Sequence, residues 1–351
     1  MKGMMDVCVL TGKQKLEWVK REIPQPGPGE LQIKLQYVGV CGSDLHFYEE
    51  GRLSNWELDG PLALGHEPGG IVSAIGEGVT GFEIGDKVSI EPAVPCGECE
   101  DCKKGHYNLC KHIKMLAIPH ERDGVNSNYC VHSAKWCYKL PDNMDTMEAA
   151  LIEPLAVGFH AARQGNARLG MTAVVTGAGC IGLVSMMALK AMGITKIIAV
   201  DVMQKRLDKA KELAATDIIN GKEQDTVEEV LKLTDGMGPD LVIETAGTEI
   251  TTRQAIKFCK KGGTIVLVGY SASGEMTLPM SLALDKELTF KTVFRYRHIY
   301  PLAIEAVASG RVNVKGIVTN VWDFDDIQNA MYQSVKDKAN IVKSVIKIAK
   351  D

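Results

Sequence analysis

The 351-residue sequence lacks the features that direct a chain into or across a membrane. It contains no run of about 18 apolar residues, the length that a transmembrane helix needs, and its first residues lack the apolar core of a signal peptide. It also lacks a basic block, and its net charge of −4 offers no electrostatic surface to nucleic acid. We therefore expect a cytoplasmic protein that has neither a membrane nor a nucleic-acid partner.

Internal repeats and low-complexity segments are absent as well, so we expect ordinary globular domains. The chain is long enough for two domains with a large core. Hydrophobic residues make up 45% and charged residues 24% of it, which is typical of a globular protein. Ten cysteines in a reducing compartment point to metal ligands or packing rather than to disulfides.

The segment 172–201 has the pattern of a strand, a glycine turn, a helix and a second strand that ends on an acid. Gly177, Gly179 and Gly182 form G-x-G-x-x-G, in which they allow a tight turn, approach of the backbone to a pyrophosphate and close helix packing. The helix N-terminus then offers N–H groups to phosphates. Asp201 can accept both ribose hydroxyls of NAD and would repel the 2′-phosphate of NADP. A glycine turn of another α/β protein is the alternative, but the flanking elements favour an NAD site.

Three zinc-ligand types occur in two short segments before residue 70. The three residues are Cys41, His66 and Glu67. Taken alone, a buried Cys41 is most often a core residue, and a lone His66 is usually a histidine whose hydrogen bonds are satisfied within the fold. Combined with a nucleotide motif, they suit a catalytic zinc, which takes three protein ligands and leaves one position for substrate. A thiolate and a carboxylate would bring the formal charge of the Zn²⁺ site near zero, and a bound alcohol would lose its proton more easily.

Four cysteines, Cys96, Cys99, Cys102 and Cys110, have the spacing C-x2-C-x2-C-x7-C. Four thiolates on one compact loop close a tetrahedral zinc site with no open position, which is structural. An iron–sulfur cluster is the rival because the first spacings also suit one, and an empty site is a further alternative. The last gap and the absence of a proline after Cys110 favour zinc.

The remaining pattern indicates two kinds of domain in an α/β protein. Short alternating apolar runs within residues 7–40 predict antiparallel β-structure, whereas strands and helices alternate from 152 to 290 and predict a doubly wound parallel sheet. The tail, 300–348, should supply two helices and short strands that return to the first domain. We expect a β-rich domain from 1–151 and 291–351 and a nucleotide domain from 152–290.

Three charged residues, Glu153, Arg206 and Arg295, have two interpretations each. Glu153, in an apolar helical run, is either a helix-surface acid or ion-pair partner, or an inward carboxylate near zinc. Arg206 follows Asp201 and is either a solvated helix residue or a neighbour of the adenosine. Arg295 lies between Phe294 and Tyr296 and either belongs to an edge strand or lines a polar pocket.

Taken together, these motifs resemble the zinc-dependent medium-chain dehydrogenases over the whole chain. The resemblance is carried by Cys41-Gly42-Ser43-Asp44-Leu45-His46, Gly65-His66-Glu67, the four cysteines and the glycine turn. Glu153-Pro154-Leu155 and Phe294-Arg295-Tyr296 resemble the sorbitol, xylitol and L-iditol 2-dehydrogenases, and the full cysteine set resembles their microbial members. The family implies a GroES-like catalytic domain, a Rossmann domain, NAD, one catalytic and one structural zinc, and usually a homotetramer.

The resemblance also implies roles for single residues. Cys41, His66 and Glu67 would bind catalytic zinc, with Glu153 as a direct or water-mediated fourth group and Asp44 orienting His66. Ser43 would take the substrate proton and His46 would pass it toward solvent. Arg295 and Tyr296 would hold further substrate hydroxyls, and Phe47 stands where such enzymes often carry a substrate-contacting tyrosine. The residues that would contact NAD are Gly177, Gly179, Ile181, Gly182, Asp201, Arg206, Val268, Gly269, Tyr270, Val293, Phe294 and Arg295.

The reaction that follows is oxidation of the C2 hydroxyl of a polyol (sorbitol, xylitol or L-iditol) to a ketose with NAD. A medium-chain dehydrogenase for another secondary alcohol, such as 2,3-butanediol, threonine or a sugar phosphate, is the nearest alternative. A non-catalytic NAD-binding relative is more remote, because it would be expected to have lost zinc ligands that this sequence retains.

Overall fold

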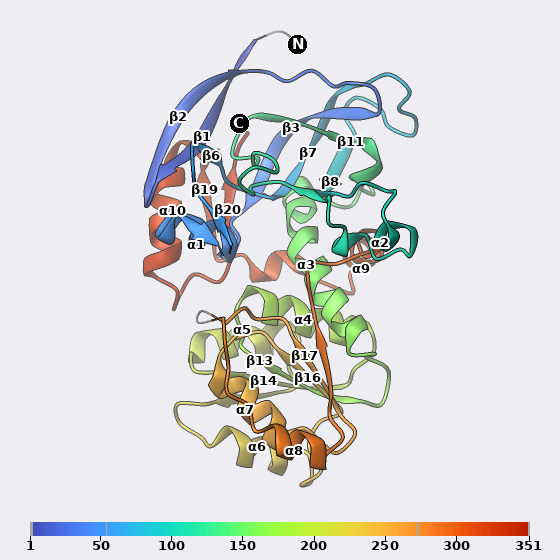
Figure 1. Ribbon diagram of the computed structural model, residues 1–351, viewed down its shortest axis with the longest axis vertical. Helices are drawn as coiled ribbons and strands as arrows, with labels where there is room; N and C mark the ends of the chain where they lie inside the picture. Colours follow the sequence, from blue (N-terminus) through green and yellow to red (C-terminus); the bar gives the residue numbers. More distant parts are fainter. Residues whose placement is uncertain (1–2, 54, 272–273, 350–351) are drawn as a thin grey trace. The chain divides into compact units, whose positions relative to one another are not determined.

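The structure, a computed structural model, describes residues 3–53, 55–271 and 274–349. The chain forms two compact units: Met1–Glu153, Tyr300–Ala308 and Val318–Asp351 make the first, and Pro154–Ile299 and Ser309–Ile317 make the second (Figure 1). None of the helices in the described ranges combines the length and the apolar character needed to cross a membrane.

The first unit is built mainly of β-strands. Its largest sheet has the order β12-β8-β7-β3-β20-β19, with β11 paired to β3, and a second sheet has the order β2-β1-β6. The strands are β1 (Met4–Gly12), β2 (Lys15–Glu22), β3 (Glu30–Gly39), β4 (Arg52–Leu53), β5 (Trp56–Glu57), β6 (Leu62–Ala63), β7 (Glu67–Ile75), β8 (Lys87–Ile90), β9 (Ala93–Val94), β10 (Lys114–Met115), β11 (Tyr129–Ser133), β12 (Cys137–Lys139), β19 (Asn320–Asp323) and β20 (Ser344–Lys347). The antiparallel β-structure predicted for the first 40 residues is therefore present.

The first unit also contains short helices and 3₁₀ turns. They are α1 (Gly42–Glu50), α2 (Glu100–Lys103), α9 (Tyr300–Ala308), α10 (Ile327–Lys336) and the 3₁₀ turns η1 (Tyr107–Leu109), η2 (Ala134–Trp136) and η4 (Phe324–Asp326), while α3 (Thr146–Gln164) contains the boundary with the second unit. The core beneath them is apolar, with Leu31, Ile33 and Leu35 of β3 almost fully buried. Burial of this apolar face is the main stabilising contribution of the sheet.

The C-terminal tail returns to the first unit, as predicted. Strand β20 pairs antiparallel with β3, so that Val345 lies opposite Gly39 and Ile346 opposite Val38. This pairing places the start of β20 next to the end of β3, only two residues before Cys41. The tail therefore helps to shape one candidate metal site.

The second unit contains a six-stranded parallel sheet with the order β15-β14-β13-β16-β17-β18, seen in the yellow-green to orange part of Figure 1. Its elements are β13 (Thr172–Thr176), α4 (Cys180–Ala191), β14 (Lys196–Asp201), α5 (Gln204–Leu213), β15 (Asp217–Asn220), α6 (Thr226–Leu233), β16 (Leu241–Glu244), α7 (Glu249–Phe258), β17 (Thr264–Leu267), α8 (Met280–Asp285), β18 (Thr289–Thr292) and the 3₁₀ turn η3 (Val314–Ile317). The central strands are buried along almost their whole length, which is typical of parallel strands covered on both faces. The predicted doubly wound parallel sheet is confirmed.

The boundary between the units differs from the prediction in the segment after residue 290. Residues 291–299 and 309–317, which we expected with the β-rich domain, group with the second unit. Strand β18 extends the parallel sheet, and Val293 donates to the carbonyl of Leu267 at 3.0 Å, which keeps the following residues there. A Cβ on Gly316 would lie 2.4 Å from the side chain of Leu213, so η3 packs closely against α5 of the same unit.

Candidate metal centres and nucleotide site

The first candidate metal centre brings Cys41, His66 and Glu67 together. One ligand atom from each lies within 4.8 Å of the others. Cys41 precedes α1, and Glu67 is the first residue of β7. His66 and Glu67 are 6% and 1% exposed, so their polar atoms have little water to bind. This set of soft and hard donors suits zinc.

Asp44 ties the two segments of this centre to each other. Its carboxylate accepts hydrogen bonds from the backbone N–H groups of Cys41 and Gly65, both at 3.1 Å, and lies 3.4 Å from Nδ1 of His66. Gly65 has φ +89° and no room for a Cβ, which would lie 2.6 Å from the side chain of Asn126. An Asp–His contact of this kind orients the imidazole, so Nε2 of His66 is the nitrogen available to a metal.

The charges of this centre act on the pKa of His66. Burial lowers that pKa, but the carboxylate of Asp44 and the thiolate of Cys41 outweigh burial and raise it well above the usual value. Burial likewise raises the pKa of Asp44, yet His66 and the two backbone donors bring it below the usual range. An anionic environment that attracts a proton to His66 also attracts a cation, and a metal would displace that proton.

Lys343, which sequence analysis did not single out, is ion-paired with Glu67. Its Nζ contacts Oε2 of Glu67 and donates to the carbonyl of Val40 at 3.0 Å. The side chains are 2% and 1% exposed. A Cβ on Gly39 would lie 1.9 Å from that same Oε2, so the ion pair depends on a glycine at the end of β3. The only hint in the sequence is a lysine directly before β20, two residues ahead of its apolar pair Val345-Ile346.

The other residues predicted around this centre occupy different environments. Glu153 is 6% exposed on α3 and is therefore no helix-surface acid, although among the described residues it is not part of the three-residue cluster. Ser43 is half-buried and His46 is exposed, both on α1. Phe47 is 1% exposed and packs in the apolar core, so its contact with a substrate stays a prediction. Tyr48 points elsewhere, with its hydroxyl accepting from Gln328 at 2.7 Å.

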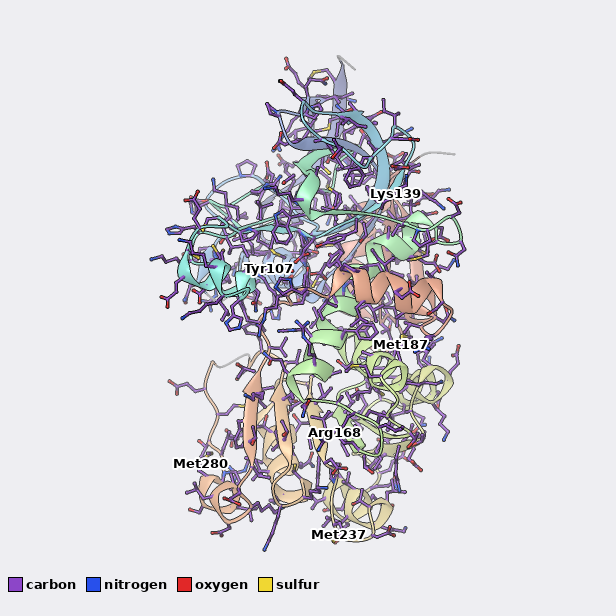
Figure 2. The ribbon with its side chains drawn as sticks, turned by 90° about the vertical axis from the view of Figure 1, so that its right-hand side faces the viewer. Tyr107, Lys139, Arg168, Met187, Met237 and Met280 are labelled. Carbon is purple, nitrogen blue, oxygen red and sulfur yellow. The ribbon has the colours of Figure 1, made fainter. Side chains whose placement is uncertain are left out.

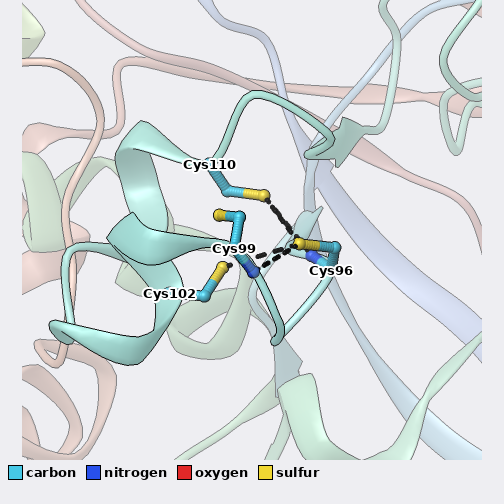
Figure 3. A group of neighbouring side chains, drawn as sticks. All are labelled: Cys96, Cys99, Cys102 and Cys110. Carbon is cyan, nitrogen blue, oxygen red and sulfur yellow. Dashed lines mark hydrogen bonds between the residues drawn. The ribbon is translucent and has the colours of Figure 1, made fainter.

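The second candidate metal centre consists of Cys96, Cys99, Cys102 and Cys110, whose sulfur atoms lie within 4.8 Å of one another (Figure 3). Backbone N–H groups donate to these sulfur atoms. The N–H of Cys96 donates to Sγ of Cys110 at 3.4 Å, and the N–H of Cys99 donates to Sγ of Cys96 at 3.4 Å. Backbone donors from Glu98 and Cys99 lower the pKa of the Cys96 thiol to about 6, which favours a thiolate there, whereas burial raises the pKa of the Cys102 and Cys110 thiols. All ten cysteines are free of disulfides.

The glycine turn has the geometry that a pyrophosphate site requires. Gly177 has φ +91°, and a Cβ on Gly182 would lie 1.8 Å from the carbonyl oxygen of Gly177. Gly179 precedes α4 and has no side chain to cap it, and the N-terminus of such a helix suits a phosphate. The guanidinium of Arg206 lies 3.8 Å from the position of a Cβ on Gly179, which adds positive charge beside the turn.

Asp201 lies at the end of β14 and is 8% exposed. Its carboxylate accepts from the backbone N–H groups of Ala178 at 2.7 Å, Val202 at 2.8 Å and Met203 at 2.9 Å. These contacts fix its orientation, and an ionised carboxylate still has acceptor capacity for ribose hydroxyls.

Apart from Ile181, which lies in the first turn of α4, the remaining predicted NAD and substrate residues of the second unit lie in two loops, after β17 and after β18. Val268 and Gly269 follow β17, and Tyr270 is 74% exposed. Arg295 has φ +55°, and its guanidinium carbon lies 4.8 Å from the ring centroid of Phe294. Tyr296 is 3% exposed. Ile181 and Val293 are partly buried.

Comparison with known proteins gives matches over nearly the whole chain. Residues 27–142 match the alcohol dehydrogenase GroES-like domain, and residues 180–309 match the zinc-binding dehydrogenase family. The chain is 43% identical to an uncharacterized zinc-type alcohol dehydrogenase-like protein of Escherichia coli (strain K12), over 99% of this chain and 100% of that protein. It is 37% identical to sorbitol dehydrogenase of Bacillus subtilis (strain 168), over 97% of each chain.

Two further matches agree with these. D-xylulose reductase A of Aspergillus oryzae is 38% identical, over 93% of this chain and 92% of that protein. The crystal structure of an oxidoreductase of unknown specificity from Escherichia coli superposes with a TM-score of 0.93 at 42% identity, covering 99% of this chain and 100% of that one.

Proposed function

Because the chain belongs to the zinc-type alcohol dehydrogenase family, we propose that it oxidises the C2 hydroxyl of a polyol such as sorbitol, xylitol or L-iditol to a ketose, with NAD as hydride acceptor. The observation that carries this proposal is the cluster of Cys41, His66 and Glu67, of which the last two are buried, in a chain that also has an NAD-type glycine turn. Similarity to a sorbitol dehydrogenase and to a D-xylulose reductase supports a polyol as substrate.

Zinc at this cluster would act as a Lewis acid that lowers the pKa of the substrate hydroxyl. Cys41, His66 and Glu67 would hold it, with Asp44 keeping the imidazole in place. Glu153 is the buried carboxylate proposed as a direct or water-mediated fourth group. The four-cysteine loop would hold the second, structural zinc, because it presents four thiolates and no open position.

Proton transfer is assigned to α1. Ser43 would accept the proton of the C2 hydroxyl, and His46 would pass it on through the cofactor ribose. The two residues are three positions apart and therefore share a helix face. Because Ser43 is half-buried and His46 is exposed, this face leads from the protein interior to solvent.

The cofactor would bind at the glycine turn. N–H groups at the start of α4 would contact the pyrophosphate, and the carboxylate of Asp201 would accept the ribose hydroxyls and repel a 2′-phosphate. Arg206 would lie beside the adenosine. The other proposed contacts are Ile181, Val268, Gly269, Tyr270, Val293, Phe294 and Arg295.

Selection of a polyol is assigned to polar groups that a simple alcohol would leave unpaired. We assign Arg295, Tyr296 and Glu153 to the further hydroxyls of the substrate, with Phe47 as an apolar neighbour. We also propose that the enzyme works in the cytoplasm, which suits ten free cysteines, and that it is a homotetramer, as is usual for the family it resembles. Sedimentation velocity measures the number of chains in the assembly.

The test is an NADH absorbance assay on the zinc-loaded enzyme. Sorbitol, xylitol and L-iditol are compared with 2,3-butanediol, threonine, 2-propanol and a sugar phosphate, and Cys41→Ser serves as the inactive control. We expect the highest kcat/KM with one of the three polyols. A higher value for butanediol, threonine or a sugar phosphate would contradict the polyol assignment and leave the dehydrogenase chemistry intact.

A further inference from the structure

Three consecutive residues, Ser89, Ile90 and Glu91, each bind a different part of the first unit. The hydroxyl of Ser89 donates to the carbonyl of Ala149 on α3 at 2.7 Å. The carbonyl of Ile90 accepts from the hydroxyl of Tyr300 on α9 at 2.9 Å. The end of β8 therefore contacts both α3 and α9, and Glu91 follows it directly.

The carboxylate of Glu91 reaches the four-cysteine loop. Its Oε1 accepts from the hydroxyl of Tyr107 at 2.8 Å, and its Oε2 accepts from the hydroxyl of Tyr138 at 2.9 Å. Tyr107 starts the turn η1 between Cys102 and Cys110, and its carbonyl accepts from the N–H of Cys110 at 3.1 Å. Tyr107 is labelled in Figure 2.

Glu91 is itself fixed on all sides. It is 1% exposed, its N–H donates to the carbonyl of Trp136 at 2.8 Å, and its carbonyl lies 3.0 Å from Nε2 of His132. It also interacts electrostatically with Glu153, and the like charges repel. A buried carboxylate is costly unless its hydrogen bonds are made, so a residue of this kind holds its partners in one arrangement.

We propose that Glu91 is a positioning residue that couples the four-cysteine loop to the helix that carries Glu153. The loop is held through Tyr107, and the helix is held through the hydroxyl of Ser89, which lies in β8 two residues before Glu91. Disturbance of the loop then loosens the first turns of α3, and the effect passes through one carboxylate.

The first test measures how fast the four-cysteine loop releases zinc. The zinc-loaded protein is mixed with a chromogenic chelator at about pH 8.5, where Glu91 is ionised, and Cys41→Ser identifies the phase that belongs to the loop. Tyr107→Phe removes a hydrogen bond to a charged acceptor and should speed release about tenfold. Tyr138→Phe removes the bond from outside the loop and should change it less than about twofold. Equal acceleration by both variants would mean general loosening and would overturn the proposal.

A double-mutant cycle tests whether the carboxylate is the partner. In a Glu91→Gln background, Tyr107→Phe removes only a neutral bond and should speed release about threefold. If it still speeds release tenfold, Tyr107 acts through another group and the coupling is refuted.

Hydrogen exchange of residues 146–153 tests the transmission to α3. Tyr107→Phe should increase both exchange in this segment and zinc release, whereas Ser89→Ala should increase exchange and leave zinc release unchanged. Unchanged exchange in Tyr107→Phe would refute the link. None of these measurements involves a polyol, so their outcome is independent of the proposed substrate.

Discussion

Lys343 and Glu67 form an ion pair in which both side chains are almost completely shielded from water, with 2% and 1% of their surface exposed. Glu67 also belongs to the candidate zinc cluster. Its carboxylate would therefore interact with two cations, the ammonium group of Lys343 and a metal ion. With Cys41 as the thiolate that a metal requires, the formal charges of Cys41, Glu67 and Lys343 sum to −1. The ion pair therefore leaves the site attractive to Zn²⁺ while it holds the Glu67 carboxylate in place.

Replacing Lys343 by methionine should destabilise the protein. The change keeps an apolar side chain of similar length and removes the cation, which leaves a buried carboxylate without its partner. Loss of one member of a buried pair costs about 3–5 kcal/mol. Denaturant unfolding of the zinc-free protein measures this, and zinc loading should recover part of the loss because the metal supplies positive charge to Glu67.

Lys139→Met is the matched control. Lys139 is ion-paired with Asp86 at 2.7 Å, but its side chain is 50% exposed. Exposed pairs contribute about 0–1 kcal/mol, so this variant should stay close to the wild type. Similar losses in both variants would show that the Lys343–Glu67 pair has no special weight.

Two zinc ions per chain should have separable roles. Cys41→Ser should lose one zinc and nearly all activity while the fold is retained, because the catalytic ligand set is broken. Cys99→Ser should lose the other and chiefly lower the melting temperature, because a closed four-thiolate site contributes to folding. Metal analysis by mass spectrometry, with thermal unfolding of each variant, checks this. A fully active wild type that holds one zinc or none would contradict it.

The sequence was informative where the chemistry lies within one short segment. Gly177 and Gly182 could be predicted because their spacing alone reports a turn that excludes side chains, and the four cysteines could be predicted from one loop. Lys343 could not, because its partner is defined by the pairing of β20 with β3. Glu91 was missed for the same reason: Tyr107 and Tyr138 meet it only after the chain has folded.

Phe47 stands where related enzymes often carry a substrate-contacting tyrosine, and its contact with a substrate stays a prediction. The ring is 1% exposed and belongs to the core of the first unit. A hydroxyl added there would have to be buried, at a cost of about 1–3 kcal/mol unless it finds a partner. Whether a side chain faces a ligand or the core depends on how the helix packs, which the local motif does not specify.

Cofactor preference should depend on Asp201. Asp201→Ala removes a charged acceptor of the ribose hydroxyls, an interaction of about 1.5–3 kcal/mol, so KM for NAD should rise about tenfold or more. The gap between NAD and NADP should narrow because the repulsion of the 2′-phosphate is lost. Initial rates with both cofactors measure the ratio.

Asp201→Asn separates the charge from the backbone contacts. The carboxylate also accepts from Ala178 and Met203, so the alanine variant loosens the turn as well. Asparagine keeps one acceptor oxygen and should retain more stability in thermal unfolding, while it still narrows the NAD/NADP gap. A wild type that already prefers NADP would refute the role of Asp201.

Stability should fall with rising pH on account of Glu91. Burial raises the pKa of Glu91 from 4.5 to about 7, with Glu153 as a smaller cause in the same direction. Between these two values the folded protein binds more protons at this site than the unfolded chain does, so the free energy of unfolding decreases as pH increases. The total effect is about 3 kcal/mol.

Glu91→Gln cannot titrate and isolates this contribution. The difference in unfolding free energy between the two proteins, measured in denaturant at about pH 5 and pH 8, should shift in favour of the glutamine variant at the higher pH. A difference that is independent of pH would mean that Glu91 keeps an ordinary pKa.

Substrate selectivity should follow from groups that only a polyol can pair. Arg295 and Tyr296 are proposed to bind hydroxyls away from C2, and Glu67 makes the metal site harder than a second cysteine would. A site built to hydrogen-bond hydroxyls rejects an analogue that lacks them by roughly 10⁴, because the site's polar groups are left unpaired. We therefore expect kcat/KM for sorbitol, xylitol or L-iditol to exceed that for 2-propanol by several powers of ten. Arg295→Ala should reduce the polyol value far more than the 2-propanol value, since only the polyol loses a partner. Equal losses of kcat/KM on the polyol and on 2-propanol would show that Arg295 acts on the cofactor or on the fold. If the wild type is equally efficient on sorbitol and on 2-propanol, the enzyme is better described as a general secondary-alcohol dehydrogenase.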